Sequence, residues 1–179
     1  LAWEQEVSDA SIFDAVSGVG FDSHPVARAV QPISGRLTGS GPALRLSPAQ
    51  NNSFRALNRA WAVGATVRYG NGEYIVTGLG GTEVDGLIGD YALQATRGPA
   101  DGIDLARPAL GIYRPWNPSM DEGWTRWLFE IYGYDFVNVR NADIRASSLA
   151  DRFDVIVLAD MGSDQIIEGF QPGSVPSRY

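Results

Sequence analysis

The polar residues that follow two apolar runs are the first candidates for chemistry in this chain. They are Arg114, Trp116, Asn117, Asp121, Glu122, Trp124 and, after the second run, Asp160. Clustered carboxylates perform general acid–base catalysis or hold a divalent metal ion. Arginine, asparagine and tryptophan instead suit a ligand crevice, and paired tryptophans also suit a docking face for another domain. Asp121 and Glu122 have a purely structural interpretation too, because acidic side chains favour the positive end of a helix.

The elements around these residues can be predicted from spacing. The run 110–114 is a strand that Pro115 and Pro118 end, and Ser119 and Glu122 have the spacing of a capping box. A helix is therefore expected over 120–132. Its apolar residues recur at i, i+3, i+4 and i+7, which predicts a stripe facing a sheet, with Trp127 in the core. The stripe consists of Trp124, Trp127, Leu128 and Ile131.

The chain continues as a parallel unit. We expect a strand at 136–139, a short helical turn near 143–148 and a strand at 153–159. Val155–Leu158 is continuously apolar, as in a strand covered on both faces. Because the carboxyl ends of parallel strands and the starts of the following helices meet at one edge, the candidate residues can share a site there.

The first half contains a different set of signals. A strand is expected at 43–46, then a helix that Asn52 or Ser53 caps and that carries Phe54, Leu57 and Trp61 on one face. Two strands, 65–69 and 73–77, flank the turn Gly70-Asn-Gly72 and predict a β-hairpin. A weaker helix follows over 82–93. Taken with the parallel unit that begins at 110, these signals lead us to expect an α/β, three-layer fold with a mostly parallel sheet, flanking helices and a β-hairpin in the first half.

We predict a first lobe over 1–96, a linker over 97–109 and a βαβ-type unit over 110–179, and the alternative is a single domain that includes all three. Leu1 stands where an initiator methionine would, and Ser177–Tyr179 follow a Pro/Gly/Ser-rich turn. We therefore expect a piece of a larger protein. Oligomeric state cannot be predicted, and a homodimer stays open.

Composition and motifs exclude several functions. The net charge of −7 without a run of arginines disfavours nucleic acid, and no apolar run approaches the roughly 20 residues of a membrane span. Without cysteine, and with His24 as the only histidine, the chain has no zinc-ligand spacing and no thiol nucleophile. The glycine run 78–81 has Glu83 where a dinucleotide-binding fingerprint needs glycine. The segment Asp160-Met-Gly-Ser163 lacks a nucleophile elbow.

Several segments together resemble the carboxyl-terminal region of large bacterial zinc carboxypeptidase-like proteins of the M14 family. They are Asn51–Arg59, Leu110–Trp116, Met120–Trp127, Asn141–Ile144 and Phe153–Leu158. The likeness covers most of 44–179, and Met-Asp-Glu-Gly-Trp-Thr-Arg-Trp is its most specific motif.

The resemblance implies a non-catalytic region with a class I glutamine amidotransferase-like, or flavodoxin-like, fold. Its partner would be a periplasmic or extracellular peptidase domain of the same polypeptide. Zinc is expected only in that separate catalytic domain, because this chain lacks the family's His-x-x-Glu pair and second histidine. It also lacks the cysteine that amidotransferase-like folds place at a strand-to-helix elbow. We therefore expect no cofactor, metal ligand or catalytic residue here.

Two other hypotheses stay open at this point. One is a small hydrolase that uses Asp121, Glu122 or Asp160 as acid and base, with or without a metal. The other is flavin or nucleotide binding at the same edge of a flavodoxin-like sheet. A rise in thermal stability with a divalent ion favours the first, and a rise with a mononucleotide favours the second.

Overall fold

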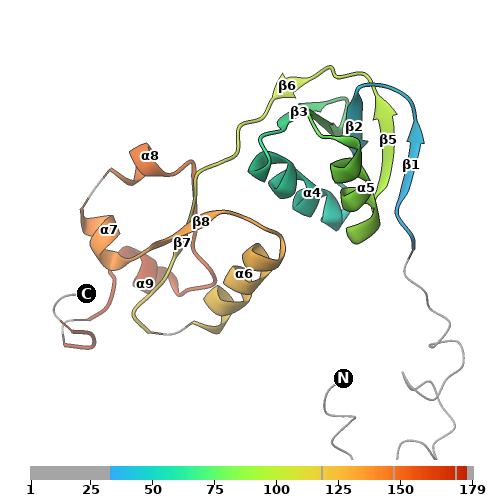
Figure 1. The fold of residues 1–179 in the computed structure, drawn as a ribbon. Coiled ribbons are helices and arrows are strands. Elements are labelled where there is room, and N and C mark those ends of the chain that lie inside the picture. The colour runs from blue at the N-terminus through green and yellow to red at the C-terminus, as the bar shows by residue number, and fades with distance from the viewer. Residues whose placement is uncertain (1–32, 118, 147, 172, 177–179) are drawn as a thin grey trace, which may run out of the picture. The chain divides into compact units, whose positions relative to one another are not determined.

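A computed structural model describes residues 33–117, 119–146, 148–171 and 173–176. Strands and helices alternate there, which confirms the α/β class. The prediction of a mostly parallel sheet is wrong, because the strands form one six-stranded mixed sheet and one three-stranded parallel sheet (Figure 1). The sequence before Ile33, including His24, lies outside the described residues.

The six-stranded sheet is built from the first half of the described chain. Its order is β1-β5-β2-β4-β3-β6, and only β1 and β5 pair in parallel. Two helices connect its strands, so that β2 to β5 read β-α-β-β-α-β, the arrangement of ferredoxin-like domains. The bounds are β1 Arg36–Gly39, β2 Ala43–Leu46, α4 Asn51–Ala62, β3 Thr66–Gly70, β4 Glu73–Thr77, α5 Gly81–Asp90, β5 Gln94–Gly98 and β6 Ile103–Asp104.

The core of this sheet lies between its strands and the helices α4 and α5. Leu44 and Leu46 of β2 are buried against Leu57 of α4 and Leu87 of α5 in one apolar cluster. The predicted hairpin is confirmed as β3 and β4. Asn71 and Gly72 have φ values of 53° and 78°, which is the left-handed conformation that a tight hairpin turn requires.

Some predictions for this half differ from the structure. Helix α4 starts at Asn51 after Gln50, so neither Asn52 nor Ser53 is its cap. Ser53 is instead buried and donates its hydroxyl to the Ser47 carbonyl at 2.8 Å. Strands β1 and β5 were not predicted, because their pairing is between distant segments. Strand β6 lies within the predicted linker, and the division at 97–109 stays a prediction.

The second half forms the three-stranded parallel sheet, in the order β8-β7-β9. Its central strand β7 is buried along its whole length. The expectation that β9 is covered on both faces is wrong, since Val155 is 46% exposed and Leu158, just after β9, is 45% exposed. The bounds are β7 Leu110–Tyr113, α6 Met120–Ile131, β8 Phe136–Val139, α7 Asn141–Arg145, α8 Leu149–Arg152, β9 Val155–Val157 and α9 Ser163–Ile167.

Helix α6 begins where the sequence predicts but faces the other way. Ser119 caps it by accepting the Glu122 backbone N–H at 3.2 Å. Phe129 contacts Phe136 of β8, with ring centroids 5.8 Å apart, and Glu122 is buried. The predicted inward stripe is exposed, and Trp127, expected in the core, is 54% exposed. An apolar period identifies a stripe without identifying what covers it.

None of the described helices is long and apolar enough to cross a membrane.

Candidate functional site

The carboxyl ends of β7 and β8 bring two arginines to one edge of the parallel sheet. Tyr113 and Val139 are register partners at the ends of these neighbouring strands. The next residue in each chain segment is Arg114 or Arg140. The Arg114 backbone N–H still donates to the Val139 carbonyl at 2.8 Å, which extends the pairing by one step. The sheet register thus places both arginines side by side.

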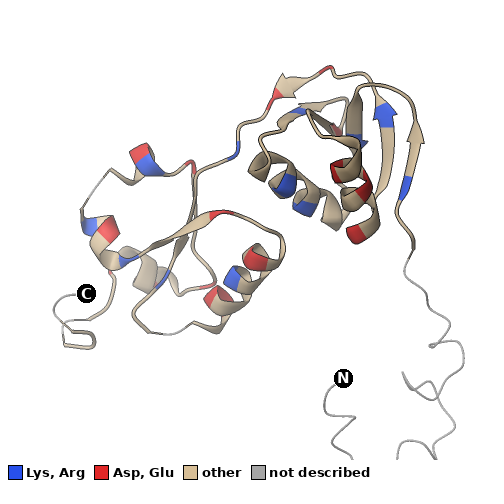
Figure 2. Ribbon diagram, in the orientation of Figure 1, with Lys and Arg blue, Asp and Glu red and all other residues tan. Residues whose placement is uncertain are grey.

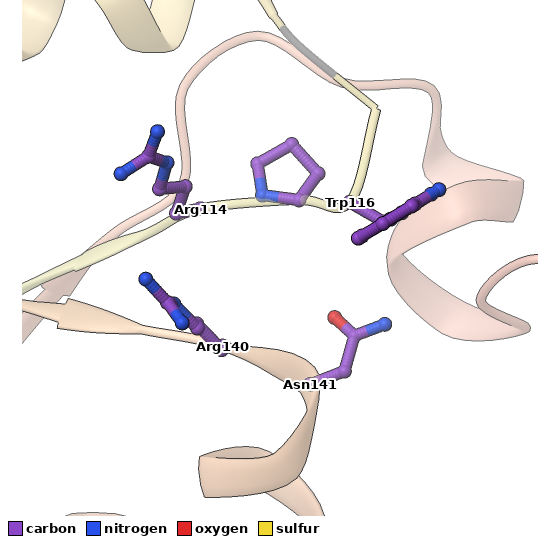
Figure 3. Close-up of a pocket in the computed structure, with 5 residues that line it drawn as sticks. Arg114, Trp116, Arg140 and Asn141 are labelled. Carbon is purple, nitrogen blue, oxygen red and sulfur yellow. The ribbon is translucent and has the colours of Figure 1, made fainter. Parts of the chain in front are cut away.

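These arginines line a pocket with a volume of about 180 Å³. The other lining residues are Pro115 and Trp116, from the loop after β7, and Asn141 at the start of α7. Figure 3 shows the Arg114 and Arg140 side chains at one end of the pocket, with the Trp116 ring and the Asn141 amide at the other. Proline fixes the backbone between Arg114 and Trp116, which limits the freedom of the loop.

The charge in this pocket is positive. Neither Arg114 nor Arg140 takes part in an ion pair among the described residues. The nearby Asp143 feels the charge of Arg140 but forms its ion pair with another residue: its carboxylate accepts the Arg140 backbone N–H at 2.9 Å and the Arg152 guanidinium at 3.1 Å. These two bonds, the backbone one first, hold the pKa of Asp143 below its ordinary value. Asp143 therefore stays ionised, with Arg152 as its ion-pair partner.

Tyr113 holds the amide of Asn141 in place. Its hydroxyl donates to Asn141 Oδ1 at 2.6 Å. Burial raises the pKa of Tyr113 above its ordinary value, against the opposing charge of Arg145. The hydroxyl is thus protonated at neutral pH and remains a donor. This bond links the last residue of β7 to the first residue of α7, so it fixes one wall of the pocket.

The side chains of this arrangement are of the kind that binds an anionic group. Guanidinium groups present planar forks of donors that match the oxygens of carboxylate and phosphate. The aromatic face of Trp116 adds an apolar wall, and it is 38% exposed. The net charge of the chain is −7, so a cationic pocket differs from the average charge of the protein. Helix α5, by contrast, carries acidic residues, drawn in red in Figure 2.

The structure brings together only part of the predicted site. Arg114 and Trp116 line the pocket, whereas the other candidates are not among its lining residues. Asn117 is exposed in the same loop, and Asp160 is exposed beyond β9. Asp121 and Trp124 are exposed on α6, and Trp124 packs edge-on against Trp127 at a centroid distance of 5.7 Å.

The carboxylates predicted as a cluster have separate environments. Glu122 is 7% exposed and forms an ion pair with Arg126 one turn further along α6. Arg126 in turn lies over the Phe136 ring, 5.4 Å from its centroid. Glu122 therefore belongs to the packing between α6 and β8. Within the described ranges, no three His, Cys, Asp or Glu side chains are grouped so that they could hold a metal ion.

Two motifs considered in the sequence have structural roles here. Glu83, which interrupts the glycine run 78–81, accepts the Gly80 backbone N–H at 2.6 Å and so closes the start of α5. Ser163 is the first residue of the short helix α9.

Sequence reasoning missed Arg140 and Asn141. The signal was present, because both follow the strand predicted at 136–139 just as Arg114 follows the strand at 110–114. The rule that polar residues after neighbouring parallel strands share an edge applies equally to both.

Fold and site thus define an α/β protein with a cationic pocket at the carboxyl edge of a parallel sheet. Comparisons with known protein families, curated proteins and solved structures find no match.

Proposed function

We propose that this chain is a non-catalytic accessory region that binds an anionic group of a ligand or partner between Arg114 and Arg140. The observation that carries the proposal is the pair of guanidinium groups that share one pocket and form no ion pair among the described residues. In a pocket of this kind a carboxylate or phosphate gains two charge-assisted contacts.

The larger protein in this proposal is a zinc carboxypeptidase-like protein of the M14 family. The motif Met-Asp-Glu-Gly-Trp-Thr-Arg-Trp at 120–127 supports it by resemblance. The peptidase domain of that polypeptide holds the zinc and lies in the periplasm or outside the cell. A coding sequence upstream of Leu1 with His-x-x-Glu and a later histidine would support this part. A frame that lacks them would remove its basis.

Anion binding is tested by calorimetry with inorganic phosphate and with acetate. We expect both anions to bind the 179-residue chain, and Arg114→Gln and Arg140→Gln each to weaken binding about tenfold or more, as for a lost charge-assisted bond. The matched control is Arg36→Gln, an exposed arginine of β1 in the other sheet, which should bind as the unchanged chain does. Equal binding by all four proteins would refute the pocket.

Absence of turnover is the second part of the proposal. Purified chain treated with a chelator is expected to leave peptide substrates intact. Cleavage by the purified chain that persists in Asp121→Asn and in Asp160→Asn would contradict the accessory role. Cleavage that is lost in either variant would favour the small hydrolase.

A second candidate is nucleotide or flavin binding on a flavodoxin-like sheet. The order β8-β7-β9 favours it, because the first strand in the chain lies between the second and the third, as in the flavodoxin-like order 2-1-3-4-5. The nucleotide phosphate would then be the anion at Arg114. Flavin mononucleotide and adenosine monophosphate test it: a rise in melting temperature larger than inorganic phosphate produces would support this candidate, and equal shifts would count against it.

A further inference from the structure

We infer that the anion bound at Arg114 and Arg140 carries an apolar chain or ring, which occupies a second cavity beside the first. This inference rests on the proposed function and names the class of its ligand. The ligand is a small amphipathic anion with one carboxylate or phosphate group.

The second cavity has a volume of about 370 Å³ and shares a wall with the cationic pocket. Asn141 lines both, and Tyr113, which donates to it, lines the larger one. The remaining walls come from α7, from the end of β9 and from α9 with the segment after it. A ligand that passes Asn141 would therefore have one end in each cavity.

Apolar side chains at this cavity are left open to solvent. Ile144, Leu158 and Ile166 all line it and are 46%, 45% and 50% exposed. These three come from separate elements, α7, the end of β9 and α9, and yet they converge on one space. Its charged lining residues, Arg145 and Glu168, have opposite signs, so the net positive charge lies in the smaller pocket.

The position of the second cavity in the sheet supports a ligand site, because Tyr113 at the end of β7 and Leu158 just after β9 both line it. The chain goes from β7 to β8 on one side and then crosses to β9 on the other, so the strand order reverses between β7 and β9. In open α/β sheets, ligands bind outside the carboxyl ends of the strands at such a point. The volumes of the two cavities together also fall within the range of about 300–1,000 Å³ that is typical of small-molecule sites.

Calorimetry with matched ligands tests the inference. Hexanoate is compared with acetate, hexyl phosphate with inorganic phosphate, and hexylammonium provides the same chain with a positive charge. We expect each hexyl anion to bind at least about tenfold more tightly than its short counterpart, because burial of several methylene groups accounts for that factor. Hexylammonium is expected not to bind. The difference between the carboxylate and phosphate series tells which head group the arginines prefer.

Substitutions then locate the chain of the ligand. Ile166→Asn should remove most of the gain from the hexyl group while acetate binds as before. Ile103→Asn is the matched control, because Ile103 is 78% exposed on β6 and lines neither cavity. Ile144→Asn is a second variant on another element of the cavity, and circular dichroism checks that each variant is folded.

Each outcome has a distinct meaning. Equal affinity for hexanoate and acetate, with both dependent on Arg140, would overturn the apolar half and leave the proposed function standing. If the gain in affinity from the hexyl group persisted in both Ile166→Asn and Ile144→Asn, the apolar half would also be overturned, because the hexyl group would then bind elsewhere. If no anion binds at all, the proposed function itself fails and this inference with it.

Discussion

Helices α4 and α6 are both 12 residues long and both carry an apolar stripe, yet they bury different sides. In α4 the stripe is covered, with Leu57 only 3% exposed and Phe54 and Trp61 packed against the core. In α6 the corresponding stripe is open, and its buried side carries the ion pair of Glu122 and Arg126. The same period in sequence has led to opposite orientations.

The difference follows from what each sheet offers. The six-stranded sheet has two helices that share one cluster of aliphatic side chains. The three-stranded sheet has one fully buried strand, β7, and Phe136 of β8 contacts Phe129 from the helix. The packed surface is small, so apolar residues outside it remain at the surface. The apolar residues around the first sheet are buried and stabilise it, whereas many apolar residues around the second sheet are exposed to solvent.

The largest expected effect is in the first core. Leu46 is fully buried in β2, so Leu46→Ala should lower the free energy of unfolding by about 2–5 kcal/mol through lost burial and a residual cavity. Urea denaturation measures it. A loss below about 1 kcal/mol would mean that the cluster around β2 is not closely packed.

Gly111 tests the packing of the second sheet. A Cβ there would lie 2.7 Å from Val139 Cγ2 and 3.3 Å from the Phe153 ring, so Gly111→Ala should cost about 1–3 kcal/mol of stability. Gly123→Ala is the matched control, since nothing lies within 4 Å of its added Cβ in α6. That change should stabilise the chain by about 0.5–1 kcal/mol because alanine favours a helix. Equal effects at both sites would contradict the close approach at Gly111.

The exposed stripe of α6 should contribute little to stability. Trp127→Ser is expected to cost less than about 1 kcal/mol, most of it from the edge-on contact with Trp124. Denaturation of the variant in urea provides the value. A loss as large as that of Leu46→Ala would show that the stripe is buried in solution and would remove the contrast between the two helices.

The smallest effect concerns alkaline pH. Because burial raises the pKa of Tyr113 in the folded chain, its contribution to stability is present below the ordinary tyrosine value of about 10 and is lost as pH rises through the raised folded value. Tyr113→Phe should show a shallower decline of stability over that window. Tyrosinate absorbance of both proteins identifies the group, and titration of Tyr113 at or below the ordinary value would contradict its burial.

Local signals were sufficient for much of this fold. Residues 43–46, 136–139 and the Asn71-Gly72 hairpin needed only alternation and turn chemistry, and the start of α6 needed only the Ser119 cap. What could not be predicted depends on distant pairing. Strand β1 pairs with β5, and β5 also pairs with β2, so both depend on segments far away in the sequence, and the mixed order of the first sheet has no local signature.

The candidate site divides in the same way. Arg114 and Trp116 were predicted because they follow a clear strand. The same rule, that polar residues after neighbouring parallel strands share one edge, would also have predicted Arg140. Asp121, Glu122 and Asp160 were grouped only on the assumption that helix starts and strand ends always converge. The ion pair of Glu122 with Arg126 shows the flaw in that assumption. A carboxylate near the edge of a sheet can point toward the interior and pair with a side chain of its own helix.

The most direct test of the account is a nuclear magnetic resonance titration of the ¹⁵N-labelled chain with inorganic phosphate. We expect the largest shifts in the backbone signals of Arg114, Arg140 and Asn141 and in the indole N–H of Trp116, and no such shifts in Arg114→Gln/Arg140→Gln. Shifts centred on the six-stranded sheet, or none at any signal, would contradict an anion site at the ends of β7 and β8.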